Sequence, residues 1–398
     1  STFFVIDKTA PQITFDGVRA NSANNGVVMP VVNYRDSYLD ETATIVTLTG
    51  TNHSDQTKKK QKNVTADGIQ LVYPDFAHVK EMDDVYTLRV KAVDLAGNEK
   101  EEELNFSVNR FGSTYKVSAD TQKLIEDCYT TKAPVITVME VNIDALEYGE
   151  VTISREGKTK TLVREKDYIV NKKGTEVEWK SYTYKIKADN FSSDGVYSVG
   201  FYSVDKAKNA SNSRMKGKEI EFVLDTTAPS IVVDDIESGK TYKEQEKKVT
   251  LDVKDNLYLS DLQVTDNGET ILCMSERELT EKNGIITFFL QEKETEREIV
   301  ITARDKAKNE QIQRFYGVLI SSKKEVLQQS VKKKTQNKKG MTERNMVTED
   351  ITEYSNNLTE PIYQKEDYLL YGVSAVTFIV VFVTAGIVQI RKKRQKKL

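Results

Sequence analysis

An alternating strand followed by the pattern Asp-x-Ala-x-Asn occurs three times in this chain of 398 residues. In the first copy the apolar residues Leu88, Val90 and Ala92 alternate with polar ones, which is the period of a half-buried β-strand. Asp and Asn side chains bond nearby backbone and favour tight turns, so we expect a turn after each strand. Successive copies lie about 100 residues apart, the length of one β-sandwich domain. The turn residues are Asp94 with Asn98, Asp205 with Asn209, and Asp305 with Asn309.

A second pattern, Ala followed by Pro, occurs near the expected start of each repeat. Proline cannot donate to a central sheet ladder and holds the preceding residue extended, so these sites predict stiff junctions that lead into edge strands. Two of the three junctions also carry an Asp before the Pro. The segments are 5–11 with Asp7, 130–134 without an Asp, and 223–229 with Asp225.

The two patterns, recurring in order over residues 3–320, resemble the bacterial Ig-like repeats of surface proteins. This resemblance implies an all-β chain of tandem Ig-like β-sandwich domains. The third copy departs from the pattern, because Arg297 stands where the others have Tyr86 and Tyr197. We therefore expect the third domain to lack a tyrosine-corner analogue.

These boundaries predict three sandwiches, over residues 1–109, 132–224 and 225–320, with a connector over 110–131. Ser118 begins a polar stretch in the connector that is typical of a short, N-capped helix. Residues 3–7 repeat the end-strand pattern of residues 222–225, so we expect a further module before Ser1.

Residues 369–390 form a run of 22 residues without formal charge. As a helix this run is about 33 Å long, enough to cross a hydrocarbon core of roughly 30 Å. Six basic residues follow it, and the positive-inside rule places them in the cytoplasm. We expect a disordered spacer over 321–367, a transmembrane helix over 368–390 and a basic cytoplasmic tail over 391–398. The N-terminal part is then extracellular on a single-pass cell-membrane protein, and the lack of an LPxTG motif favours a retained anchor over wall attachment.

The composition argues against several function classes. The net charge is −3, and six basic residues lie among the last eight. The rest of the chain therefore lacks the excess of basic residues that a nucleic-acid-binding protein needs. Two His and two Cys are too few for a structural zinc site or a disulfide scaffold. No phosphate-binding, dinucleotide-binding or hydrolase motif occurs. We expect no enzyme activity and no cofactor in this chain, with calcium as the one ion to consider.

Two kinds of ligand site are open to interpretation. Aspartates in turns and junctions place oxygen ligands together, as calcium prefers, and the repeats that this chain resembles sometimes bind calcium at their junctions. The same residues serve equally well as turn caps. The calcium candidates are Asp7, Asp94, Asp205, Asp225 and Asp305. For glycan stacking the candidates are Trp179, Tyr182 and Tyr184, and the alternative is a core strand with alternating aromatics.

These features predict a cell-surface stalk or adhesin that displays Ig-like modules for binding or spacing. Its expected partner is an extracellular glycan or a host or cell-wall protein. The alternative is a set of accessory modules and an anchor that belong to a surface carbohydrate-active enzyme with its catalytic domain elsewhere. A signalling receptor is disfavoured, because eight residues after the apolar run leave no room for an output domain.

Overall fold

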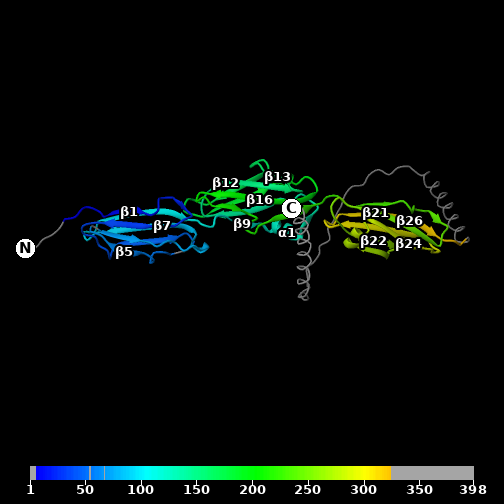
Figure 1. The fold of residues 1–398 in the computed structure, drawn as a ribbon, viewed down its shortest axis with the longest axis horizontal. Coiled ribbons are helices and arrows are strands. Elements are labelled where there is room, and N and C mark those ends of the chain that lie inside the picture. The colour runs from blue at the N-terminus through cyan, green and yellow to red at the C-terminus, as the bar shows by residue number, and fades with distance from the viewer. Residues whose placement is uncertain (1–5, 53–54, 67, 324–398) are drawn as a thin grey trace, which may run out of the picture. The chain divides into compact units, whose positions relative to one another are not determined.

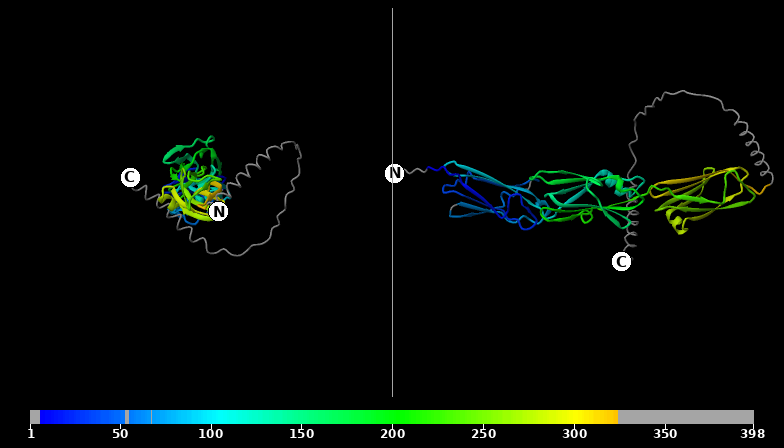
Figure 2. Two further views of the ribbon diagram at one scale, coloured as in Figure 1. Left: turned by 90° about the vertical axis from the view of Figure 1, so that its right-hand side faces the viewer. Right: turned by 90° about the horizontal axis from the view of Figure 1, so that it is seen from above.

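The computed structural model describes residues 6–52, 55–66 and 68–323. Most regular structure within these ranges is β-strand, arranged as six sheets that pair into three sandwiches (Figure 1). The right-hand view of Figure 2 shows the same three groups of strands from a second direction. Each sandwich encloses its own buried apolar cluster, so the all-β prediction is confirmed for this part of the chain.

The first sandwich packs two four-stranded sheets together. One sheet has the order β1 (Gln12–Asp16), β3 (Val31–Arg35), β6 (Gly68–Val72) and β5 (Gln61–Val64). The other has the order β2 (Ala23–Asn24), β8 (Glu99–Val108), β7 (Asp84–Val93) and β4 (Ile45–Gly50). A 3-10 turn, η1 (Lys80–Met82), leads into β7.

The second sandwich repeats this plan with extra strands. One sheet has the order β14 (Tyr168–Lys173), β15 (Lys180–Ile186), β11 (Ile136–Asn142) and β9 (Thr114–Val117). The other has the order β10 (Tyr129–Thr130), β18 (Ile220–Leu224), β16 (Gly195–Asp205), β12 (Leu146–Arg155) and β13 (Lys158–Thr161), with β17 (Ala210–Asn212) also on β16. Helix α1 (Ala119–Asp127) and the 3-10 turn η2 (Ala188–Asn190) lie between strands.

The third sandwich has one short and one long sheet. The short sheet has only three strands, in the order β19 (Ser230–Val233), β21 (Glu246–Lys254) and β24 (Ile285–Gln291). The long sheet has the order β20 (Thr241–Tyr242), β26 (Glu310–Ile320), β25 (Arg297–Asp305), β22 (Leu259–Asp266) and β23 (Glu269–Ser275). Helix α2 (Glu276–Glu281) connects the two sheets through the β23–β24 link.

The alternation that predicted the strands sorts side chains as expected. Leu88, Val90 and Ala92 on β7 are fully buried, while Arg89 between them is exposed. The same phase recurs on β25 with the buried residues Ile299, Ile301 and Ala303. Each buried Leu, Ile or Val contributes about 1.5–3 kcal/mol relative to an exposed one, so this face holds the strand in its sandwich.

The tyrosine corner is present in two copies and replaced in the third. Tyr86 donates its hydroxyl to the carbonyl of Met82 (2.9 Å), and Tyr197 donates to the carbonyl of Ser193 (2.7 Å). In the third sandwich the buried Arg297 donates to Asp266 Oδ2 (3.1 Å) and to the carbonyl of Gln291. A guanidinium thus makes the backbone bond that the phenol makes elsewhere, but it needs a buried carboxylate beside it.

The expected connector over residues 110–131 is wrong, because this segment supplies strands to the second sandwich. β9 pairs with β11, and β10 pairs in parallel with β18. Pro134 accordingly precedes β11, as Pro30 precedes β3 in the first sandwich, and does not mark a module start. The helix expected within this segment is α1, and Ser118 accepts the backbone N–H of Thr121 as its N-cap.

Within residues 6–323, aside from the three omitted positions, no helix is both long and apolar enough to span a membrane. The predicted transmembrane helix over 368–390 lies outside the described residues. So do the basic tail and all but the first three residues of the predicted spacer.

Candidate functional site

The Asp-x-Ala-x-Asn turns form one geometry three times. In each copy the Asn backbone N–H donates to one oxygen of the Asp carboxylate and the Asn amide donates to the other. The backbone bonds are 2.8 Å in the Asn98 turn, 2.9 Å in the Asn209 turn and 2.8 Å in the Asn309 turn. The side-chain bonds are 2.7, 3.0 and 2.7 Å in the same order. The residue before each Asn has a positive φ, which explains why Gly97 suits the first copy.

Each turn also binds the segment that enters its own sandwich. The amide of Asn98 donates to the carbonyl of Asp7 (3.2 Å), and that of Asn309 donates to the carbonyl of Asp225 (2.9 Å). In the middle copy Asn209 donates to the carbonyl of Asn109 (2.7 Å). Asn109 is therefore the counterpart of Asp7 and Asp225, a relation hidden by the misleading Pro134 pattern.

Two of the three sites gather three carboxylates. Oxygens of Asp7, Asp36 and Asp94 lie within 4.8 Å of one another in the first sandwich. Those of Asp225, Asp255 and Asp305 do so at the third. Four of these residues are among the calcium candidates.

The other two, Asp36 and Asp255, were missed by the sequence analysis. Each directly follows a core strand, Asp36 after β3 and Asp255 after β21. β3 and β21 hold the same place in their sheets, and an Asp directly after this strand is the signal that could have identified both residues.

The third cluster is electrostatically unsatisfied. Asp225 is 1% exposed and Asp305 is 2% exposed. Burial, together with the neighbouring carboxylates of Asp255 and Asp305, raises the pKa of Asp225 to about 6. Burial likewise raises the pKa of Asp255, whose Oδ1 atom is buried without a hydrogen-bond partner. A proton, or a cation that takes oxygen ligands, relieves the repulsion between carboxylates in such a site.

The middle site differs by two side chains, because Asn109 takes the place of Asp7 and Asp225, and Asn142 takes the place of Asp36 and Asp255. Asn109 Nδ2 donates to Asp144 Oδ2 (2.9 Å), Asp205 Oδ2 (2.9 Å) and Asn142 Oδ1 (3.0 Å), and Asn109 itself is fully buried. An amide therefore supplies the hydrogens between the carboxylates here. Asp205, the fifth calcium candidate, lies in this network, where its Oδ2 atom accepts hydrogens from Asn109 and Asn142.

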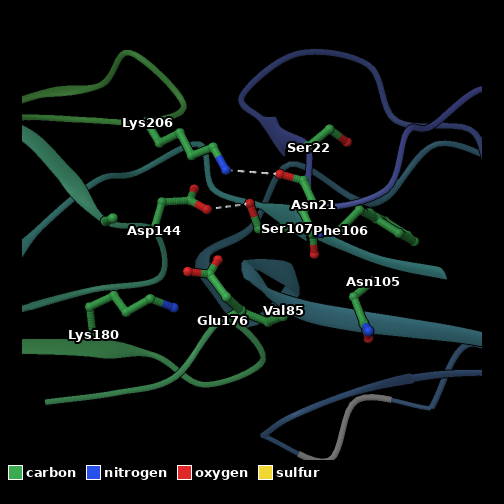
Figure 3. A pocket seen from close by; sticks show the side chains of 11 residues that line it. Asn21, Ser22, Val85, Asn105, Phe106, Ser107, Asp144, Glu176, Lys180 and Lys206 are labelled. Carbon is green, nitrogen blue, oxygen red and sulfur yellow. Dashed lines mark hydrogen bonds between the residues drawn. The ribbon is translucent and has the colours of Figure 1, made fainter.

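The middle network continues into the contact between the first and second sandwiches (Figure 3). Ser107 donates its hydroxyl to Asp144 Oδ1 (2.7 Å), and Lys206 donates its ammonium group to the carbonyl of Asn21 (3.0 Å). A cavity of about 90 Å³ lies beside these bonds, and its lining also includes Lys180. Polar contacts thus tie the two sandwiches together at this junction.

The predicted glycan-stacking residues do not form an exposed aromatic surface. Tyr182 is 8% exposed and Tyr184 is 6% exposed, on the core side of β15. Tyr184 donates its hydroxyl to the buried Glu140 (2.9 Å). Trp179 is partly buried and donates its indole N–H to Asp84 of the first sandwich (2.7 Å). The alternative interpretation, a core strand with alternating aromatics, is correct for the two tyrosines.

Comparison with known proteins identifies the first sandwich. Residues 1–109 match the family model described as bacterial Ig-like domain (group 3). The first sandwich is a bacterial Ig-like domain. A search of the curated proteins found no match to the chain.

Solved structures similar to this chain include three multi-domain proteins. The tetra-tandem repeat in the extending region of a large adhesion protein is 15% identical, with a TM-score of 0.31, over 79% of this chain and 74% of that one. The mouse nectin-like molecule 4 ectodomain is 10% identical, with a TM-score of 0.29, over 75% and 96%. The Clostridium thermocellum CbhA fibronectin(III)-like modules are 12% identical, with a TM-score of 0.25, over 52% and 94%.

Proposed function

We propose that this protein is a single-pass, membrane-anchored surface protein that displays Ig-like modules outside the cell for adhesion or spacing. The observation that carries the proposal is the threefold bond from a turn Asn to the carbonyl of the entering segment. This bond fastens each entering segment to the sandwich that follows it, which suits a stalk or spacer made of linked modules. The uncharged run and basic tail at the C-terminus supply the anchor.

Cell location is tested by protease treatment of intact cells that express the full chain with an epitope tag at each end. We expect loss of the N-terminal tag and retention of the C-terminal tag. Permeabilised cells are the control, because both tags are then cleaved. Protection of both tags in intact cells would contradict an extracellular display role.

The adhesive role is tested with cells that carry the full chain, applied to arrays of glycans and extracellular matrix proteins. Cells with the empty vector are the control. Retention on at least one surface supports adhesion. Retention on none favours a spacing or accessory role, including the alternative of modules attached to a carbohydrate-active enzyme. The reading frame preceding Ser1 separates these two, because an α/β barrel there favours the enzyme and further sandwiches favour the stalk.

As part of this role, we propose that the first and third carboxylate clusters bind calcium. The support is their oxygen-only donor sets, and at the third cluster the partnerless Oδ1 of Asp255. Calorimetric titration of the chelator-treated full chain with CaCl₂ should give two sites. Asp255→Asn should remove one of them, whereas Asp120→Asn at an exposed helix position should remove none. A heat signal unchanged by Asp255→Asn would contradict the assignment.

A further inference from the structure

Among the residues that the structure describes, the third sandwich has no counterpart of one strand that both of the other sandwiches have. β6 and β15 occupy matching places, each next to the central strand of its sheet, and each is covered on its far side by one more strand. β5 covers β6, and β14 covers β15, in both cases antiparallel. β24 holds the matching place in the third sandwich, but within the described residues no strand pairs with its far edge.

The chain uses the corresponding segment differently. In the second sandwich the hairpin β12–β13 is followed by β14, whereas in the third the hairpin β22–β23 is followed by α2. Helix α2 packs on β22 and β23, with Leu279 buried in the core, and the Ser275 and Glu278 capping box fixes its start. The segment that would have supplied the fourth strand is therefore committed to a helix.

Side-chain exposure agrees with an uncovered edge. On the outer face of β24, Ile285 is 48% exposed and Phe289 is 51% exposed. On the covered strands, Gln70 of β6 and both Ser181 and Thr183 of β15 are half-buried on the outer face, and only Lys185 near the end of β15 is exposed there. The inner-face residues of β24 remain in the core, so the strand is well anchored to its own sheet.

β24 also lacks the features that usually protect an edge strand. Natural edges carry charged residues, prolines or bulges that discourage pairing with another chain. The outermost strands of the sister sheets follow this rule, with Lys62 in β5 and with Lys172 and Lys173 in β14. The seven residues of β24 include no charge and no proline, and its pairing with β21 is regular.

We propose that β24 is a strand-acceptor site that binds an extended peptide segment of a partner protein as a fourth, antiparallel strand. β14 shows what fits this place, because it pairs antiparallel with β15 over six consecutive residues. Apolar residues at alternate positions of the peptide continue the core lined by Ile286, Phe288 and Leu290. The intervening residues lie beside Phe289 and Ile285 on the outer face.

The strand-acceptor site would give the displayed protein a class of binding partner. It rests on the proposed function only in placing that partner outside the cell. The test uses purified full chain in lipid nanodiscs, so its outcome is independent of the cell-surface experiments. A phage library of random 12-residue peptides is selected on the wild-type chain. Selected peptides are synthesised with a fluorophore and titrated by anisotropy against three forms of the chain: wild type, T287K/F289K and V232K.

Both lysine variants place charge on exposed outer-face positions of the same sheet, on β24 in the first case and on the opposite edge strand β19 in the second. We expect peptides with apolar residues at alternate positions. Their affinity should fall at least about tenfold for T287K/F289K and stay unchanged for V232K. Peptide binding should also slow amide exchange selectively in residues 285–291.

Failure to enrich any peptide, equal binding to wild type and T287K/F289K, or protection confined to another segment would each overturn the proposal. Circular dichroism melting of the variants identifies any binding loss that reflects unfolding. Where T287K/F289K melts early, the exchange footprint on the wild-type chain decides the question.

Discussion

The substitution Asn109→Asp adds a third carboxylate to the middle site, while the amide of Asn142 stays in place. The change replaces an amide by a carboxylate of nearly the same shape beside Asp144 and Asp205. Asn109 Nδ2 has two hydrogens for three acceptors, two of which belong to carboxylates. A hydrogen bond to a charged group contributes about 1.5–3 kcal/mol, so loss of both should cost about 3–6 kcal/mol. The new charge adds repulsion at neutral pH.

The same substitution should create a calcium response where the wild type has none. The new carboxylate would then lie beside those of Asp144 and Asp205, and the amide oxygen of Asn142 offers a fourth oxygen ligand. Binding to the folded state alone stabilises by about 2.7 kcal/mol at a ligand concentration 100 times Kd. Calcium should therefore recover about half of the loss in Asn109→Asp.

Hydrogen exchange of residues 109–145 in the full chain is the suitable assay, because several sandwiches unfold in one protein and a single melting curve does not assign the change. Asn109→Ala is the matched control, since it removes the same bonds without adding a carboxylate and should be destabilised with no calcium response. The reasoning is refuted when Asn109→Asp opens as rarely as wild type, or when calcium protects both variants equally.

Three further changes test other parts of the structure. Burial raises the pKa of Asp225 to about 6 in the folded protein, so the folded state binds more protons than the unfolded state between roughly pH 4 and 6. Without calcium, the free energy of unfolding should therefore fall by about 1–3 kcal/mol as the pH rises through this window. Urea unfolding at a series of pH values measures this slope, and Asp225→Asn should flatten it. Asp266→Asn leaves the buried Arg297 guanidinium without its counter-charge, and should cost the third sandwich about 3–5 kcal/mol by hydrogen exchange of β25; an unchanged opening rate contradicts the pairing. Ser118→Ala removes the N-cap of α1 and should cost about 1 kcal/mol in local opening of that helix, whereas Ser118→Asp should cost less.

Sequence reasoning succeeded where the determining interactions are local. The alternation in β7 and the Asp94 turn are both set by residues within a few positions of one another, so their pattern alone predicted strand and turn. It failed where partners come from distant segments. Asp255 lies 50 positions before Asp305, and only the pairing of the strands brings the two carboxylates together.

The aromatic prediction failed for a different reason. A period of two assigns Tyr182 and Tyr184 to one face of a strand, but it does not say whether that face looks inward or outward. The structure shows that the face is internal, where Glu140 accepts the hydroxyl of Tyr184 and, from another sheet of the same sandwich, that of Ser203. A buried carboxylate surrounded by hydroxyl donors has no signal in the local sequence.

The three junctions share one backbone contact but differ in the side chain beside it. The turn Asn binds the carbonyl of the entering residue, and every amino acid offers that carbonyl, so the fastening does not depend on the side chain at positions 7, 109 and 225. The side chain at these positions can therefore differ between junctions. An Asn donates hydrogen bonds to the neighbouring carboxylates, whereas an Asp adds a further negative charge beside them. Under the calcium proposal, this residue, together with the one at the position of Asp36, Asn142 and Asp255, determines whether the stability of a junction follows the ion concentration. The middle junction, with Asn109, should keep its stability when calcium is removed, while the third should lose part of it.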